Sequence, residues 1–503
     1  MQGATLIYVK MKHRKVHIPT SKVLFSHERV DITPPVGIFQ RLWGAAKHYQ
    51  STGIHRPLYG DIVALNASGG ANTPLLLIEL DMCTMLPNDY SLMINTISKA
   101  ANIPSQNLII TFSHTHSFGW LIEPEEYQYP GTEMIKPYLQ SISTKIANAS
   151  KQALSNVKEA TITYSAGKCN LAVNRDFWDE EANKYVCGYN PDVSADDTVI
   201  VGRVVDKQGK IIATIVNYAC HPTTLAWQNT LSSPDFIGSM REIVEQKTGA
   251  PCIFLQGASG DLAPREGYTG DTAIADKNGR QLGYSILSIL ESMGPPEMDY
   301  QYIGYVESGA RLGAWSYVPF NEERMKQSSV FMGKQYEVNL TIKEELPTIE
   351  KLKEQMNNWL TIQNEAIKKG DEKTARDAGA YAERCKRLIS RLNKLSNLTY
   401  YPLTFHVYRI GDSIWVFIEG EIYSKVQTEL RKRFPELVVI VVTLCGSWLV
   451  GYIPPSDLYG KGICQEQVSL LSAGSLEKLL NAIEYEISKL NSSLYSHTFY
   501  GTR

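Results

Sequence analysis

The stretch Leu108-Ile-Ile-Thr-Phe-Ser-His-Thr-His-Ser117 predicts a short buried strand that ends in two histidines. Side chains two residues apart lie on one face of a strand, so His114 and His116 can face the same cleft. Neutral imidazole is the commonest zinc ligand, which makes a metal site one interpretation of this motif. Two buried histidines that only form hydrogen bonds are the other interpretation.

A second apolar run, residues 211–220, leads to His221 in the same way. Pro222 has no backbone N–H for a central sheet ladder, so we expect His221 at a strand end, where α/β proteins gather their functional sites. Two histidine sites at strand ends favour a metal over two unrelated histidines.

A third run, beginning at Ile253, opens into a loop of small residues that carries Gln256, Asp261 and Arg265. Glycines in this loop let backbone amides approach a ligand closely, and Arg265 could hold a carboxylate or another anion. Ser259 lacks the G-x-S-x-G spacing of a nucleophile elbow, so a role as nucleophile is not expected.

The arrangement of the apolar runs predicts an α/β fold. Residues 23–229 alternate short β-rich runs with helical ones, and similar runs resume over residues 404–443. We therefore expect a mixed β-sheet core with helical layers, which forms a single catalytic domain over residues 1–503.

Residues 348–397 differ from the rest of the chain. Leu352, Met356 and Leu360 recur at near-helical spacing, and a second helical pattern follows the turn at residues 369–371. This pattern predicts a helical hairpin inserted into the α/β body.

The composition is that of an ordinary globular protein. Of the 503 residues 43% are hydrophobic and 20% are charged, and the net charge of −2 lacks the basic excess that phosphate backbones require. Nucleic acid is therefore not expected as a partner. The eight cysteines are scattered without a C-x-x-C pair, which argues against a zinc ribbon or a disulfide scaffold.

No apolar run reaches the about 18 residues of a transmembrane segment, so none is expected. Residues 1–15 mix charged residues with a brief apolar patch and lack the features of a signal peptide. The sequence as it stands predicts a cytoplasmic protein, and a periplasmic or secreted one if a leader has been removed. The oligomeric state is left open.

Eight short motifs occur in one order along the chain: Asp31-Ile-Thr-Pro-Pro35, Ile54-His-Arg-Pro-Leu58, His114-Thr-His116, Asn174-Arg175, Asn217-Tyr-Ala-Cys-His-Pro222, Gly260-Asp261, Glu419-Gly-Glu421 and Gly451-Tyr-Ile453. In this order they resemble the catalytic domain of the neutral (non-lysosomal) ceramidase family, and they span nearly the whole chain. The sequence looks most like a bacterial ceramidase-like branch that lacks the family's C-terminal immunoglobulin-like domain.

The resemblance implies a zinc ion with four protein ligands: His114, His221, Glu421 and Tyr452. It also implies that His116 and Arg175 line the substrate pocket. Glu419 is the competing carboxylate, but relatives often carry Pro at that position. Tyrosine is an unusual zinc ligand, so the assignment of Tyr452 depends mainly on the resemblance.

The sequence departs from the family in the loop after the third run. Relatives carry a Ser that is implicated in catalysis before the loop proline, where this chain has Ala263. Alanine has no hydroxyl, so we expect metal-bound water to attack instead, its pKa lowered by the metal. His116 or Asp261 could take the proton, and Arg175 or Arg265 could stabilise the developing negative charge.

A second departure lies near Cys464, where a further pocket tyrosine of the family is replaced. Ceramide itself is then doubtful as the substrate. We expect a zinc-dependent hydrolase that cleaves an amide bond in an N-acyl lipid or another N-acyl small molecule, with Asn174, Gln256 and Arg265 in contact with the substrate.

Two alternatives remain open. One is a metal-dependent glycoside or ester hydrolase that acts on a carbohydrate-type substrate or glycoconjugate, with Trp120 or Trp178 as aromatic platforms. The other is a non-catalytic binding protein of the same fold that uses residues 348–397 as its contact arm.

Overall fold

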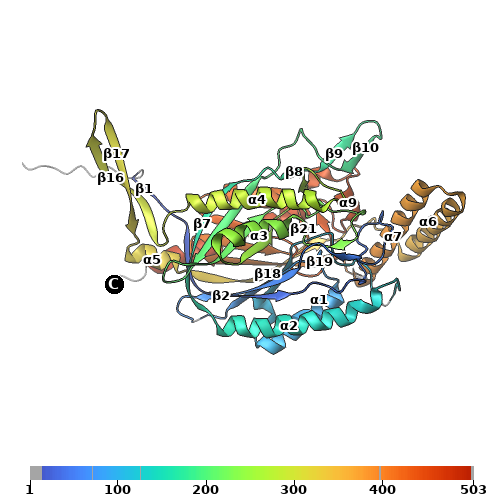
Figure 1. Ribbon diagram of the computed structural model, residues 1–503, viewed down its shortest axis with the longest axis horizontal. Coiled ribbons are helices and arrows are strands. Elements are labelled where there is room, and N and C mark those ends of the chain that lie inside the picture. Colours follow the sequence, from blue (N-terminus) through green and yellow to red (C-terminus); the bar gives the residue numbers. More distant parts are fainter. Residues whose placement is uncertain (1–13, 71, 125, 396–397, 500–503) are drawn as a thin grey trace, which may run out of the picture.

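The computed structural model describes residues 14–499 apart from residues 71, 125, 396 and 397. Residues 1–13, on which the expectation about a leader depends, lie outside the described residues. The body is a large curved sheet with helices on its outer face and a smaller sheet against its inner face. Figure 1 shows helices on both sides of the strands.

Among the described residues, the large sheet has eight strands. In spatial order they are β14 (Cys252–Gln256), β12 (Ile211–Tyr218), β11 (Thr198–Val205), β7 (Lys158–Lys168), β2 (Thr20–Asp31), β4 (Tyr59–Ala67), β5 (Leu75–Leu80) and β6 (Leu108–Phe112). The β12–β14 and β5–β6 pairs are parallel and the others antiparallel, which confirms the predicted mixed sheet. The curvature brings the two end strands, β14 and β6, into contact.

Amphipathic helices cover the outer faces of both sheets. The helices are α1 (Pro87–Ala101), α2 (Ile135–Ser155), α3 (Phe236–Thr248), α4 (Thr272–Ser292), α8 (Lys425–Arg433) and α10 (Ser475–Phe499). The first two pack on the half of the large sheet that contains β4, β5 and β6, and the next two pack on β11, β12 and β14. The last two cover the smaller sheet.

The smaller sheet packs against the inner face of the large one. Its strands are β18 (Phe331–Thr341), β19 (Tyr400–Ile410), β20 (Ser413–Ile418) and β22 (Val438–Val442). In β20, Trp415 and Phe417 face the large sheet, whereas Ile414 and Val416 face α8 and α10. A strand buried on both faces needs a continuous apolar run rather than alternation, as this sequence has.

The predicted helical hairpin is present as α6 (Ile349–Lys369) and α7 (Glu372–Leu395). It lies between β18 and β19, which pair with each other, so it interrupts a continuous hairpin of the smaller sheet. Residues 396 and 397, which the predicted range includes, lie outside the described residues.

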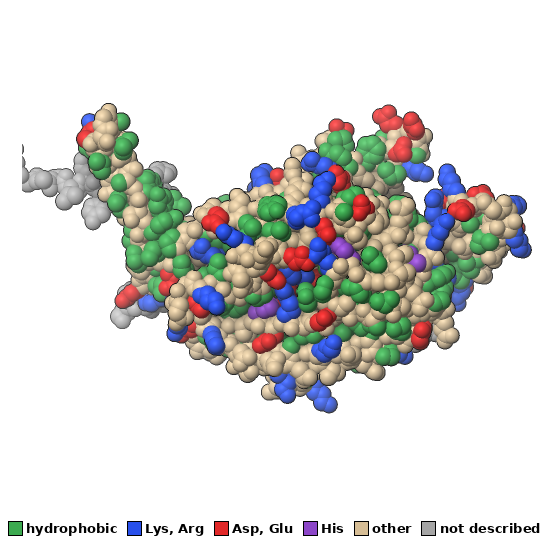
Figure 2. Space-filling view, in the orientation of Figure 1, with side chains coloured by type: hydrophobic (Ala, Val, Ile, Leu, Met, Phe, Trp, Pro, Cys, Tyr) green, Lys and Arg blue, Asp and Glu red, His purple; other side chains and the backbone are tan. Residues whose placement is uncertain are grey.

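A second projection was not predicted. Strands β16 (Met298–Glu307) and β17 (Arg311–Pro319) form a hairpin that projects from the body, and β1 (Lys15–Val16) pairs with its edge. Figure 2 shows hydrophobic side chains along this hairpin. Ile303 and Tyr305, both in β16, are 62% and 59% exposed. Because apolar side chains point outward here, the apolar-in, polar-out alternation of an ordinary surface strand is missing. Within the described residues, no helix is long and apolar enough to cross a membrane.

The inter-sheet core generates the first prediction. Phe417 is 0% exposed and contacts the rings of Trp415, Tyr408 and His406 between the two sheets. Phe417→Ala should lower the free energy of unfolding in urea by about 3–5 kcal/mol, because a cavity remains that the rigid sheets cannot fill.

Tyr284→Ala, at a position 59% exposed on α4, is the matched control. Its effect should stay within about 0.5 kcal/mol. Equal effects of the two substitutions would contradict the assignment of Phe417 to the core between the sheets.

Candidate metal centre

Strand ends bring the four residues of the implied zinc site together. His114 follows β6 and His221 follows β12, while Glu421 begins β21 (Glu421–Ile422) and Tyr452 begins β23 (Tyr452–Ile453). The two short strands pair in parallel, with Glu421 opposite Tyr452. His114 has a φ of 69°, a conformation uncommon outside glycine that is concentrated at functional sites.

Three donor atoms from His114, His221 and Glu421 converge on one point. The two Nε2 atoms are 3.1 Å apart, and Oε2 of Glu421 lies 3.2 Å from Nε2 of His114 and 3.1 Å from Nε2 of His221. Tetrahedral zinc with bonds of about 2.0–2.1 Å holds its ligand atoms about 3.3 Å apart. The three atoms therefore fit a zinc ion with only small shifts.

Hydrogen bonds on the far side of each ring fix both imidazoles. Nδ1 of His114 donates to the carbonyl of Cys83, and Nδ1 of His221 donates to that of Ser259, at 2.7 Å each. A carbonyl can only accept, so in neutral imidazoles the two Nε2 atoms are lone pairs that face each other and a carboxylate. One positive charge at this point, a proton or a metal ion, resolves the conflict.

The protonation preferences agree with a shared charge. Burial lowers the pKa of His221 to about 3. Burial also disfavours a proton on His114, but Cys83 and Glu421 outweigh it and raise the pKa of His114 to about 10. Although burial opposes ionisation of Glu421, the His114 charge and its hydrogen bonds hold its pKa well below the ordinary value. Without a metal, a proton on His114 balances the Glu421 carboxylate.

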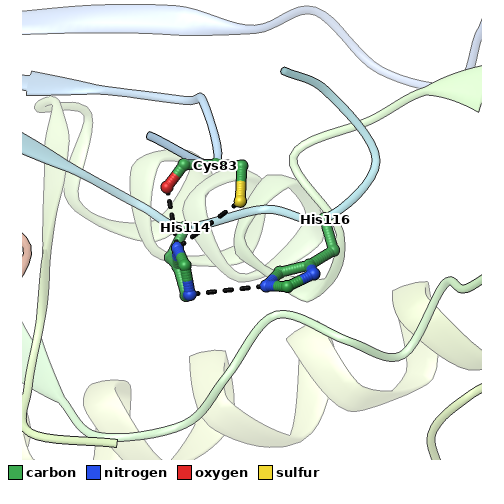
Figure 3. A group of neighbouring side chains, drawn as sticks. All are labelled: Cys83, His114 and His116. Atoms are coloured by element: carbon green, nitrogen blue, oxygen red, sulfur yellow. Dashed lines mark hydrogen bonds between the residues drawn. The ribbon is translucent and has the colours of Figure 1, made fainter. Parts of the chain in front are cut away.

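Cys83, His114 and His116 form a second close group (Figure 3). The thiol of Cys83 is 3.6 Å from Nδ1 of His114, but that nitrogen already donates to the Cys83 carbonyl. His116 instead places Nε2 3.3 Å from Nε2 of His114, beside the three converging atoms. The group with His221 and Glu421 is therefore the better candidate for a metal ion.

Tyr452 and Arg175 close the other side of the centre. The Tyr452 hydroxyl is 3.3 Å from Nε2 of His221, and Nη2 of Arg175 donates to that hydroxyl at 3.2 Å and to the Gly260 carbonyl at 2.7 Å. Burial and the Glu421 charge raise the pKa of Tyr452 well above its ordinary value, so the metal-free phenol keeps its proton. Glu419, the competing carboxylate, instead accepts a hydrogen bond from Tyr401.

Comparisons with known proteins point to the same family as the sequence motifs. A family model described as neutral/alkaline non-lysosomal ceramidase, N-terminal, matches residues 25–268. Over these residues the chain is similar to the neutral ceramidase family, in agreement with the resemblance that its motifs show. This match supports a ceramidase-like hydrolase.

Two solved structures share the fold of this ceramidase-like chain. One is the neutral ceramidase from Pseudomonas aeruginosa, with a TM-score of 0.61 and 14% identity over 93% of this chain and 74% of the other. The second, described as ceramidase complexed with C2, has the same TM-score and identity over 92% of this chain and 74% of the other. At this identity, the likeness establishes the fold alone. A search of curated proteins gives no match.

The loop after β14 serves mainly to support this centre. Gln256 is fully buried and donates to the Cys220 carbonyl and to the Ser259 hydroxyl. Ser259 is 2% exposed, and its hydroxyl lies 3.2 Å from Nδ1 of His221. Ala263 is fully buried in β15 (Leu262–Pro264), where it offers no hydroxyl. Gln256 thus positions the loop rather than contacting a substrate.

The other predicted polar residues lie at different depths. Asn174 is 8% exposed and accepts a hydrogen bond from the backbone N–H of Asp176. Arg265 is exposed and lies over the ring of Tyr189 at 5.9 Å. Asp261 accepts hydrogen bonds from Ser424, which ties the loop to the start of α8. Of the polar residues predicted from this loop, Arg265 is the one that reaches solvent.

The prediction of Trp120 as a platform is wrong. Trp120 is 1% exposed, and its indole N–H donates to Asp89 inside the fold, whereas Trp178 is 40% exposed. The aromatic residue beside the centre is Trp43, whose ring lies 5.2 Å from that of His116. Trp227 and Tyr268 contact Trp43 at 6.2 and 6.0 Å. No local motif marks these three residues in the sequence.

The environment of Asp261 predicts a pH effect. Burial raises its pKa to about 6, although the bonds from Ser424 oppose the shift. The pKa of Asp261 is higher in the folded chain than in the unfolded chain. Protonated Asp261 therefore contributes its full stabilisation of the fold below about pH 4, and this contribution is lost as the pH rises through about 6. Between about pH 4 and 7, the free energy of unfolding of the native chain should fall by about 2–3 kcal/mol relative to Asp261→Asn.

Urea unfolding of both proteins across this pH range checks the prediction, because all other ionisable groups are common to the two. If the free energies of unfolding of the two proteins changed with pH in parallel, Asp261 would ionise equally easily in the folded and unfolded chains, and the prediction would be wrong.

Proposed function

We propose that this ceramidase-like chain is a zinc-dependent hydrolase that cleaves an amide bond in an N-acyl lipid or N-acyl small molecule. The observation that carries the proposal is the convergence of two anchored imidazole nitrogens and one carboxylate oxygen on a point that needs a positive charge. His114, His221 and Glu421 would hold the metal, with Tyr452 as the fourth ligand. When bound, Zn²⁺ supplies Lewis-acid polarisation of a carbonyl and acidifies water.

His116 is the residue best suited to accept a proton. Burial and the neighbouring His114 and His221 hold its pKa well below the ordinary value, so its imidazole is neutral. Its Nε2 lies next to the converging atoms, within reach of a water that reacts there. Asp261 is less suited to this role, since both of its oxygens already accept hydrogen bonds from Ser424.

Arg175 is the residue best suited to stabilise negative charge. Burial disfavours its charge, but Tyr452 and other neighbours outweigh that and raise its pKa well above the ordinary value, so it remains a cation. Its bonds to Gly260 and Tyr452 orient the guanidinium beside the centre. With Ala263 in the loop, the proposed reaction proceeds without a serine nucleophile at this position.

A carbohydrate-type substrate is the second candidate, cleaved at a glycosidic or ester bond. It is favoured by the cluster of Trp43, Trp227 and Tyr268 beside His116, because aromatic faces and edges suit the apolar faces of a sugar ring. The indole N–H of Trp43 is buried and has no acceptor in the described part of the chain. Such a donor would suit a substrate oxygen.

Substitution of the proposed ligands tests the function. His221→Ala and Glu421→Gln should abolish stoichiometric zinc binding and lower kcat/KM by at least about 100-fold, because each removes a donor from the converging set. Metal analysis of purified protein and hydrolysis of N-acyl amides and glycosides provide the measurements. His17→Ala, at an exposed histidine outside the centre, should change neither.

Four results would count against the proposal in different ways. Native protein without metal, or His221→Ala with native hydrolysis, would refute the metal-dependent hydrolase. Cleavage of glycosides or esters but not amides would select the second candidate. Stoichiometric zinc without hydrolysis of either class would indicate a binding protein of this fold.

A further inference from the structure

Helix α7 packs against the loop that precedes Tyr452. Arg391, which is 5% exposed, donates from Nε to the Leu449 carbonyl at 2.5 Å and from Nη1 to the Val468 carbonyl at 2.9 Å. A Cβ added at Gly451 would lie 2.9 Å from Nη2 of Arg391, so the guanidinium packs directly on the backbone next to Tyr452. One side chain of the inserted hairpin thus fixes the segment between β22 and β23.

A relay leads from Arg391 to the proposed metal ligand Glu421. The guanidinium carbon of Arg391 lies 4.5 Å from the centre of the Trp448 ring, a cation–π distance. The indole N–H of Trp448 donates to Oε1 of Glu421 at 2.7 Å. Glu421 therefore uses Oε1 for Trp448 and Oε2 for the two imidazoles. The hydrogen bond from Trp448 therefore fixes the orientation of the Glu421 carboxylate.

An earlier part of α7 holds a second loop of the centre. Arg387 donates from Nη2 to the Leu42 carbonyl at 2.6 Å, and Arg41 pairs with Glu383 at 3.2 Å. A Cβ added at Gly44 would lie 2.9 Å from that of Ala380, so helix and loop are in close contact. Between these contacts lies Trp43, the residue beside His116.

The burial of Arg391 indicates a role other than packing α7 against the loop. A buried guanidinium costs several kcal/mol unless its hydrogen bonds and neighbours compensate. Its two acceptors are backbone carbonyls, and its Nη2 has no acceptor within the described residues. An apolar side chain would join α7 to this loop at lower cost. Burial lowers the pKa of Arg391 to about 9, and Glu421 opposes that shift.

We propose that α7 is a positioning element of the metal centre, in which Arg391 orients Glu421 through Trp448 while residues 380–387 hold Trp43 beside His116. This inference rests on the proposed function, since it assumes that Glu421 binds a metal. Arg391 and Trp448 are positioning residues, because they act through Glu421 rather than on a substrate. The inserted hairpin, on this account, is part of the hydrolase site and not a separate arm.

Zinc affinity, measured by competition with a chelating dye, tests the relay without any substrate. Arg391→Met removes the charge and the donors, and Trp448→Phe keeps a ring beneath Arg391 but removes the N–H. Each should weaken zinc binding by about 10–100-fold, the usual effect of losing a group that orients a ligand. Arg391→Lys, which retains the charge and a single donor nitrogen, should restore part of the loss.

Arg376→Met is the matched control, because Arg376 lies on the same helix and, in the part of the chain that the structure describes, pairs only with its neighbour Asp377 at the surface. It should bind zinc as the native protein does. If the two residues act in one relay, the double variant Arg391→Met/Trp448→Phe should bind zinc about as weakly as the weaker single variant.

The outcomes separate the two proposals. Native protein that binds no zinc would refute the proposed function itself. Native protein that binds zinc, together with unchanged affinity in Trp448→Phe, would overturn the relay alone, and so would strictly additive losses in the double variant. Trp448→Phe keeps the test decisive even if Arg391→Met fails to fold, since it preserves the ring on which Arg391 packs.

Discussion

The candidate metal centre depends on how β22 of the smaller sheet contacts the ends of β6 and β14 of the large sheet. Hydrophobic contact between the sheets is non-directional and would tolerate many offsets. Hydrogen bonds select one of them: Thr443 donates its N–H to Gln256 at 3.0 Å, Gly446 donates to Ile110 at 3.2 Å, and the Thr111 hydroxyl donates to Thr443 at 2.9 Å. This offset sets the end of the smaller sheet, and with it Glu421, over the two histidines.

Local sequence patterns were sufficient to predict the buried strands and the helical hairpin. Apolar runs identify buried strands because both faces of β6, β12 and β20 are covered, and the helical period marks α6 and α7 clearly. The histidines could be predicted for the same reason, since each directly follows such a run. Glu421 could be preferred to Glu419 only by family resemblance, because alternation places both carboxylates on one face of a strand.

The parts that sequence could not provide depend on long-range contacts. Trp448 and Arg391 have no motif of their own, and the role proposed for them depends on a hydrogen bond and a ring contact between distant segments. Trp120 was misjudged because a Trp close to H-x-H gives no sign of whether its ring faces solvent. The β16–β17 hairpin was not predicted from the sequence because its apolar side chains point outward. This reverses the rule that apolar patterns mark the interior.

The three converging residues lie far apart in the sequence, which determines the order in which they become available during synthesis. The region that matches the family model carries His114 and His221, while Glu421 lies 200 residues beyond the second histidine. At translation rates of about 5–20 residues per second, roughly 10–40 s pass before the carboxylate leaves the ribosome. The histidine pair therefore spends that interval without its anionic partner, and the proposed metal site is among the last features that a newly synthesised chain completes.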